Sequence, residues 1–261
     1  MSLSSEHLAQ LLEAKRLLES PGLAAKATNL LGTPIEKGFA LLPDKWSQRI
    51  GESTRDALMV AMKAALLTMG REGKEAYPRW HKVAAVVSGA AGGAFGLPAL
   101  VVELPISTTI MCRSIADIAR ANGESLDSVT TRLACIEVFA LGGASKQDDA
   151  AETGYFAVRA ALANAVSDAA QYLASHKVAE EGAPALVRLI ALIAGRFQIQ
   201  VSEKVAAQAV PVIGAASGAV INLLFIDHFQ GMSRGHFTVR RLERQYGSGE
   251  VKAAYEGIER A

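Results

Sequence analysis

The sequence predicts an all-α protein, a compact bundle of roughly eight to ten helices with two buried, Gly/Ala-rich helical hairpins. Along most of the 261-residue chain, apolar residues recur at the spacing of amphipathic helices. No segment alternates apolar and polar residues between turn signals, as a half-buried strand does. The hairpins are predicted from two long uncharged runs, residues 83–102 and 205–226, which are rich in Ala, Gly and Val.

The composition is that of a globular protein with almost no net charge. Half of the residues are hydrophobic and 20% are charged, and the formal net charge is +1, so no overall field favours nucleic acid. Residues 1–19 form a charged amphipathic pattern rather than an apolar signal segment, and two cysteines do not make a disulfide framework. We therefore expect a reduced, cytoplasmic protein.

Capping residues and helix breakers mark the expected helices. Ser4 or Ser5 begins the first helix, Asn122-Gly123 and Gly142-Gly143 end two later ones, and Pro184 suits the first turn of another. The longer expected helices cover residues 44–69, the stretch from Pro105 to Asn122, and residues 126–141, 148–176 and 184–209. Residues 1–70 are expected to pack on a main domain of residues 71–261 as one continuous domain.

Both uncharged runs raise the question of a membrane span, since about 20 apolar residues cross a bilayer. Their glycines recur at GxxxG spacing, as Gly89/Gly93, Gly92/Gly96 and Gly214/Gly218, which lets helix backbones approach closely. Each glycine inside a helix costs ~1 kcal/mol relative to alanine, so tight packing has to compensate. We therefore expect both runs to be buried in the isolated protein. Shallow insertion into a bilayer and the wall of an apolar pocket both remain open.

Glu103 is the one charged residue between Val83 and Thr109. A carboxylate among apolar neighbours must find a partner or take up a proton. One interpretation is a structural ion pair, for which Arg113 is the nearest candidate along the chain. The other is an acid that faces a ligand and has a raised pKa.

Further polar residues lie on or beside the same segments. Arg113 and Asp117 are four residues apart, on one face of a helix. Asp227 and His228 are neighbours that do not face each other on a helix. The candidate ligand-binding set is Glu103, Thr109, Arg113, Asp117, Asn222, Asp227 and His228.

Motifs for metal, phosphate or nucleophilic chemistry are absent from the sequence. It contains no HExxH, CxxC, P-loop or GxSxG pattern, so we expect no metal and no cofactor, and no catalytic residue is assigned. Cys112 and Cys135 are predicted to be neighbouring buried thiols, the usual environment of free cysteine.

Basic and aromatic residues flank the two uncharged runs. Such residues favour a membrane interface that contains anionic lipid, although an ordinary solvated helix face is an equal alternative. The candidate interface residues are Arg79, Trp80, Lys82, Arg234, Phe237, Arg240, Arg241 and Arg244.

Four segments of the chain resemble the EcsC protein family. They are GAAGGAFGLPALVVELP, RSIADIARANGESLD, ACIEVFALGG, and PVIGAASGAVINLLFIDHF with the later HFTVRRLERQYG, and they extend over residues 80–247. The resemblance implies a bacterial protein linked to an ABC transporter, because the family takes its name from an operon that also encodes one. It implies no established reaction and no catalytic residues.

The leading functional hypothesis is a non-enzymatic helical protein attached peripherally to the inner membrane from the cytoplasm. Its partners would be anionic lipids or an apolar ligand such as a lipid. The alternative is a soluble enzyme or small-ligand binder in which Glu103, Arg113, Asp117 and His228 converge. A third possibility is a structural partner of a transporter.

Overall fold

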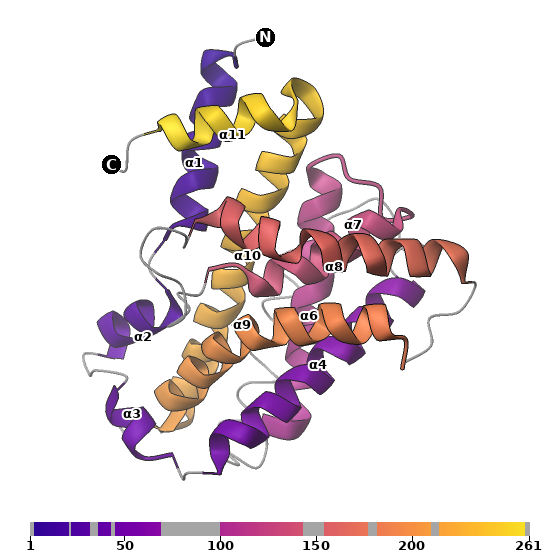
Figure 1. Ribbon diagram of the computed structural model, residues 1–261. Coiled ribbons are helices and arrows are strands. Elements are labelled where there is room, and N and C mark those ends of the chain that lie inside the picture. Colours follow the sequence, from indigo (N-terminus) through magenta and orange to yellow (C-terminus); the bar gives the residue numbers. More distant parts are fainter. Residues whose placement is uncertain are drawn as a thin grey trace.

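A computed structural model of the chain is shown in Figure 1. The structure describes residues 3–20, 22–31, 36–42, 45–68, 100–142, 154–176, 182–209 and 214–258. Over these residues the chain forms ten α-helices and one 3₁₀ helix and contains no strand, which confirms the all-α prediction.

The helices follow one another with short connections in much of the described chain. The α-helices are α1 (Ser5–Leu18), α2 (Leu23–Leu31), α3 (Glu36–Ala40), α4 (Trp46–Thr68), α6 (Leu100–Ala121), α7 (Val129–Glu137), α8 (Tyr155–Ser175), α9 (Pro184–Ala209), α10 (Gly214–Tyr246) and α11 (Ser248–Gly257), and the 3₁₀ helix Val138–Ala140 follows α7.

Several helix ends lie where the sequence predicts them. The Ser4 side chain accepts a hydrogen bond from the backbone N–H of His7 at 3.2 Å and caps α1. Gly123 and Gly142 have φ angles of 78° and 77°, which glycine adopts without the steric cost of a side chain. Pro184 is the first residue of α9, where its missing N–H breaks no helical hydrogen bond.

α6 begins before its expected start, and α10 extends well beyond the second uncharged run. α6 begins at Leu100 and continues through Pro105, so the expected start at this proline is wrong. Because Pro105 lies in the second turn, it removes a single backbone bond, the one to the carbonyl of Val101. α10 continues without a break across Asp227 and His228, since no helix-breaking residue occurs there.

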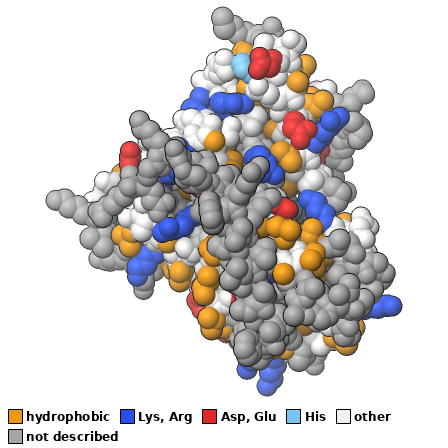
Figure 2. All heavy atoms as spheres, turned by 180° about the vertical axis from the view of Figure 1, so that it is seen from behind, with side chains coloured by type: hydrophobic (Ala, Val, Ile, Leu, Met, Phe, Trp, Pro, Cys, Tyr) orange, Lys and Arg blue, Asp and Glu red, His pale blue; other side chains and the backbone are white. Residues whose placement is uncertain are grey.

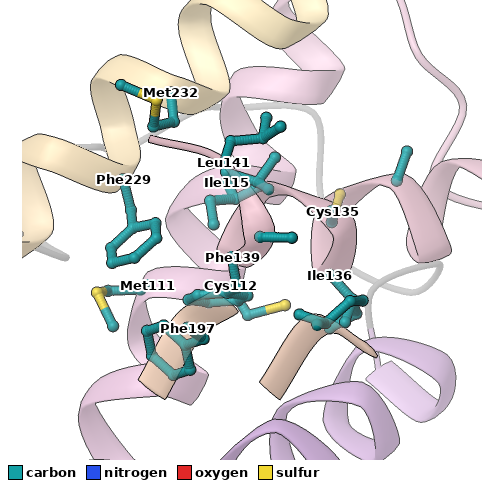
Figure 3. Close-up of a cluster of buried hydrophobic side chains, with 14 of the residues drawn as sticks. Met111, Cys112, Ile115, Cys135, Ile136, Phe139, Leu141, Phe197, Phe229 and Met232 are labelled. Atoms are coloured by element: carbon teal, nitrogen blue, oxygen red, sulfur yellow. The ribbon is translucent and has the colours of Figure 1, made fainter. Parts of the chain in front are cut away.

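The core is built around α9, which crosses the middle of the molecule (Figure 1). Its residues Ile193, Phe197 and Val201 are completely buried. The ring centre of Phe139, in the 3₁₀ helix, lies 5.0 Å from that of Phe197 and 5.2 Å from that of Phe229. This aromatic cluster joins α9, α10 and the 3₁₀ helix that follows α7 (Figure 3).

The first helix packs against the last two. A Cβ placed on Gly235 of α10 would lie 2.6 Å from Leu18 Cγ of α1, so only glycine allows this close approach. Lys15 of α1 donates hydrogen bonds from Nζ to the carbonyl oxygens of Tyr255 (2.9 Å) and Ile258 (2.7 Å) at the end of α11. α1 and α11 therefore lie together at one end of the molecule (Figure 1).

The two predicted hairpins are covered unequally by the described residues. Residues 83–99 of the first run, including its GxxxG glycines, lie outside them. The second run begins in the last turns of α9 and ends in the first half of α10. Lys204 Nζ of α9 lies 5.0 Å from the ring centre of Phe225 of α10. Val205, Ala206 and Ile221 within this run are buried.

Candidate functional site

A buried ion pair lies where the start of α6 meets the end of α9. Lys204 Nζ donates to Glu103 Oε1 at 2.6 Å, and the two side chains are 0% and 6% exposed. Glu103 is in the first turn of α6, where the helix dipole favours a negative charge. The expectation of an ion pair is thus met, but Lys204 rather than Arg113 supplies the cation.

The last turns of α9 bring three further elements to the same end of the molecule. Gly38 of α3 lies so close that a Cβ on it would be 1.9 Å from the carbonyl oxygen of Ala206. The Gln198 side chain donates to the backbone oxygen of Ser47 at the start of α4, at 3.2 Å. The start of α10 lies there too, since Phe225 faces Lys204. Both uncharged runs of the sequence therefore join the described structure at this end.

Apolar side chains are exposed on these elements. On α6, Val101 is 54% exposed, Val102 67% and Ile106 49%. We name six exposed apolar residues, which lie on α3, in the turn after it and near the starts of α6 and α10, the apolar end: Phe39, Leu41, Val101, Val102, Ile106 and Val220. In Figure 2, hydrophobic side chains gather in the lower half of the face, beside residues that are not described. An exposed group of this kind is typical of a surface that contacts a partner or a membrane.

The other candidate ligand-binding residues on α6 lie farther along the helix than Glu103. Asp117 lies about 21 Å along the axis from Glu103, so one small ligand does not contact both carboxylates. Arg113 donates to the hydroxyl of Thr68 on α4 at 3.3 Å, and Asp117 forms an ion pair with Arg120 at 3.0 Å. The Thr109 hydroxyl donates to the carbonyl oxygen of Pro105, one turn earlier.

The candidates on α10 are also spread along their helix. Asn222 and His228 are buried, whereas Asp227 is partly exposed and acts electrostatically on Lys26. Within the described part of the chain, neither ring nitrogen of His228 has a hydrogen-bond partner. Burial, with a smaller contribution from the charge of Lys26, lowers the pKa of His228 to about 4. The imidazole is therefore neutral near pH 7 and packs against Gly142. The structure does not bring the predicted residues together into one cleft.

A second buried polar cluster was not predicted. The Tyr155 hydroxyl and His236 Nδ1 lie 2.9 Å apart, and Arg159 donates to that hydroxyl at 3.3 Å. Because arginine only donates, the hydroxyl accepts from Arg159 and is free to donate to His236. Arg159 also binds both carboxylate oxygens of Glu243, at 2.8 and 3.0 Å. This network connects α8 to α10.

Glu137, at the end of α7, borders the same network. Burial raises the pKa of its carboxyl, against the opposing effect of the charges of Arg159 and Arg240. Burial likewise lowers the pKa of His236 well below its usual range, and the same two arginines add to this effect. Glu137 and His236 lie in two of the segments that resemble the EcsC family, ACIEVFALGG and HFTVRRLERQYG. The network was missed because no local pattern indicates which distant helices pack together.

The predicted interface residues after the second run mostly contact other parts of the chain. Arg240 donates from Nε to Glu124 at 2.9 Å, and Arg244 contacts the same carboxylate. Burial would raise the pKa of Glu124, but the hydrogen bond and charge of Arg240, with Arg244 and the Thr131 hydroxyl, lower it. Arg241 donates to the Gln10 side chain at 2.8 Å, Phe237 is completely buried, and Arg234 is exposed. Arg79, Trp80 and Lys82 lie outside the described residues.

The two cysteines occupy the core, as predicted. Cys112 and Cys135 are free, fully buried, and part of the cluster in Figure 3. Burial raises the pKa of the Cys112 thiol to about 12. The pKa of Cys135 is raised by burial and also by Cys112, so the two thiols are close enough to interact. Thiols in this state are poor nucleophiles.

Among the described residues, possible metal ligands do not gather in one place, and one helix has the length and hydropathy of a membrane span. No group of three or more His, Cys, Asp or Glu side chains there is placed to hold a metal ion. Of the described helices, α9 alone has the length and hydropathy of a span, and 44% of its most apolar window is buried. This is weak evidence for a membrane span, because the core helix of a soluble protein has the same properties.

The structure defines an all-α protein with a long central helix, and with a buried ion pair and an apolar end at the same end of the molecule. The chain belongs to the EcsC protein family, whose model matches residues 5–242. The match begins at the first residue of α1 and so includes residues 5–70, where the resemblance of single segments was less clear. Comparisons with curated proteins and with solved structures gave no match.

Proposed function

We propose that this EcsC-family protein is a peripheral membrane protein that contacts the bilayer through its apolar end. The observation that supports the proposal is the exposure of Val101, Val102 and Ile106 on the first turns of α6. Apolar side chains of the neighbouring elements α3 and α10 extend the same surface. Burial of such side chains at the boundary between headgroups and acyl chains is favourable.

The size of the apolar end fits reversible attachment. Complete burial of one Val, Leu, Ile or Phe side chain contributes ~1.5–3 kcal/mol. The exposed side chains are about half accessible, so each contributes ~1 kcal/mol when a bilayer covers it. Together they supply several kcal/mol, which corresponds to an affinity in the millimolar to micromolar range.

The arginines after the second run lie far from this surface. Arg240 is about 30 Å along α10 from Val220, and Glu124 already neutralises much of its charge. We therefore assign the first contact to the apolar side chains rather than to these arginines. A transporter partner, as the family resemblance implies, would meet the protein at the same membrane surface.

The buried ion pair gives this surface its geometry. It fixes the first turn of α6 on α9, so that Glu103 faces inward while Val101 and Val102 face outward. In this proposal Glu103 and Lys204 support the contact surface and take no part in chemistry.

Sedimentation with vesicles of neutral phosphatidylcholine tests the proposal. The parent protein should sediment with the vesicles, and the double variant Val102→Glu/Ile106→Glu should bind at least about tenfold more weakly. The matched control is Val187→Glu/Leu192→Glu, which changes two exposed apolar residues in the first half of α9. The proposal is wrong if the parent does not bind, or if the control loses as much binding as the test variant.

A further inference from the structure

We propose that the apolar end recognises anionic lipid headgroups through Lys37, Lys45 and Arg49. This inference rests on the proposed membrane contact and adds the class of lipid that the surface selects. None of the three residues belongs to the basic flanks that the sequence pattern indicated.

The three cations lie on the elements that form the apolar end. Lys37 is in α3, which packs on the end of α9 through Gly38, and it precedes the exposed Phe39. Lys45 and Arg49 border the start of α4, which the Ser47–Gln198 hydrogen bond holds against the same helix. All three side chains are exposed. Exposed positive and apolar side chains therefore occur together on these elements.

An aromatic ring accompanies the cations. Trp46 begins α4 and is half-buried, and the Arg49 guanidinium lies 5.7 Å from its ring centre. Tryptophan with lysine and arginine is the combination that membrane interfaces favour, because the amphipathic ring lies at the level of the headgroups. The same stretch thus combines a ring, exposed apolar side chains and free positive charge.

The local charge favours an anionic partner. Glu36 is exposed beside Lys37, whereas Glu52 lies about 10 Å along α4 from Lys45 and receives a hydrogen bond from Gln48. That separation is about one Debye length at physiological salt, so Glu52 offsets Lys45 weakly. Glu52 is only three residues from Arg49 on α4, so it offsets part of that charge. Among the described residues, none of the three cations forms an ion pair, in contrast to Arg240 and Arg244.

Each cation near an anionic membrane surface strengthens binding by about fivefold at low salt. Three cations opposed by Glu36 and in part by Glu52 should therefore give a preference for anionic over neutral vesicles of about fivefold to tenfold. The preference should decrease as salt rises, because screening weakens interactions between exposed charges.

The experiment compares vesicles of phosphatidylcholine alone with vesicles that also contain phosphatidylglycerol. The variant Lys37→Gln/Lys45→Gln/Arg49→Gln should keep the parent's affinity for neutral vesicles and lose most of the anionic preference of about fivefold to tenfold. The matched control Arg188→Gln/Arg234→Gln/Lys252→Gln removes the same number of exposed positive charges elsewhere and should keep the preference. Circular dichroism melts establish that each variant remains folded.

The outcomes separate the inference from the proposed function. If the test variant keeps the anionic preference, or the control loses it equally, the inference is wrong, while binding to neutral vesicles still supports the apolar contact. If the parent binds anionic vesicles alone and Val102→Glu/Ile106→Glu binds them equally well, the apolar contact is wrong. Loss of the preference in the test variant would then still support the role of the three cations.

Discussion

Lys204 and Glu103 face each other almost without access to water, so each buried charge is stabilised in the folded protein by the other. The change Glu103→Gln should destabilise the fold by roughly 3–5 kcal/mol, because it leaves a buried ammonium without its counter-charge. Adding Lys204→Met should recover much of this loss, since the second change removes the buried charge. Urea unfolding of the parent, the two single variants and the double variant gives the coupling free energy.

An exposed ion pair provides the comparison. Arg188 and Asp168 lie 3.7 Å apart with side chains 65% and 51% exposed, so Asp168→Asn should change the unfolding free energy by less than ~1 kcal/mol. A coupling near zero between Glu103 and Lys204 would contradict their assignment as a structural pair. It would return Glu103 to the candidates for a ligand site.

His228 should make the fold sensitive to acid. Its pKa is about 4 in the folded protein, against 6.5 as the ordinary value, so the unfolded chain binds more protons between these limits. This contribution to stability is complete above pH 6.5 and is lost as the pH falls through the folded pKa, by ~1.4 kcal/mol per pH unit. We expect His228→Gln to flatten the decline in the unfolding free energy between pH 6.5 and 4.5. Some decline should remain, because the pKa of buried His236 is also lowered.

The control for this experiment is His176→Gln, which changes an exposed histidine at the end of α8. It should follow the parent over the whole pH range. A His228→Gln variant that loses stability in acid as steeply as the parent would show that other groups cause the decline.

At the scale of helices, the contact of α1 with α10 depends on two glycines with unequal roles. A Cβ on Gly235 would lie 2.6 Å from Leu18 Cγ and 2.9 Å from the carbonyl oxygen of Ala14, whereas one on Gly231 would lie 3.7 Å from its nearest atom, in Leu17. Gly235→Ala should therefore destabilise the protein by ~1–3 kcal/mol through overpacking. Gly231→Ala should be neutral or stabilising by up to ~1 kcal/mol, because alanine favours the helix.

Thermal melts of the two variants provide the measurement, and each variant is the other's control. Equal melting temperatures would mean that α1 can move away from α10 without cost. This pair of glycines has the same GxxxG spacing as the glycines of the uncharged runs. It was missed because Arg234 and other polar residues lie beside it, so the segment is not apolar.

Over the whole molecule, the sequence was informative about local structure and less so about contacts between distant segments. Ser4, Gly123, Gly142 and Pro184 mark helix ends correctly, because capping depends on a few adjacent residues. The limits of α6 were missed because a proline in the second helical turn resembles one that precedes a helix.

The partner of Glu103 could not be identified in the same way. Lys204 is 101 positions away in the sequence, and only the packing of α6 on α9 brings the two together. A signal was nevertheless present, since Lys204 immediately precedes the second uncharged run and Glu103 immediately follows the first. Two isolated opposite charges at the borders of two buried segments are candidates to pair, because each needs a counter-charge once buried. The network of Tyr155, Arg159 and His236 offered no comparable pattern.

The direction of α10 also determines where a domain fused to this protein would lie. The helix is about 50 Å long, starts at the apolar end and finishes beside α1 and α11, where both chain ends lie (Figure 1). If the apolar end lies on a bilayer, both chain ends point away from the lipid. A fluorescent or affinity domain fused to either of them would then stand several nanometres above the membrane and leave the contact surface uncovered.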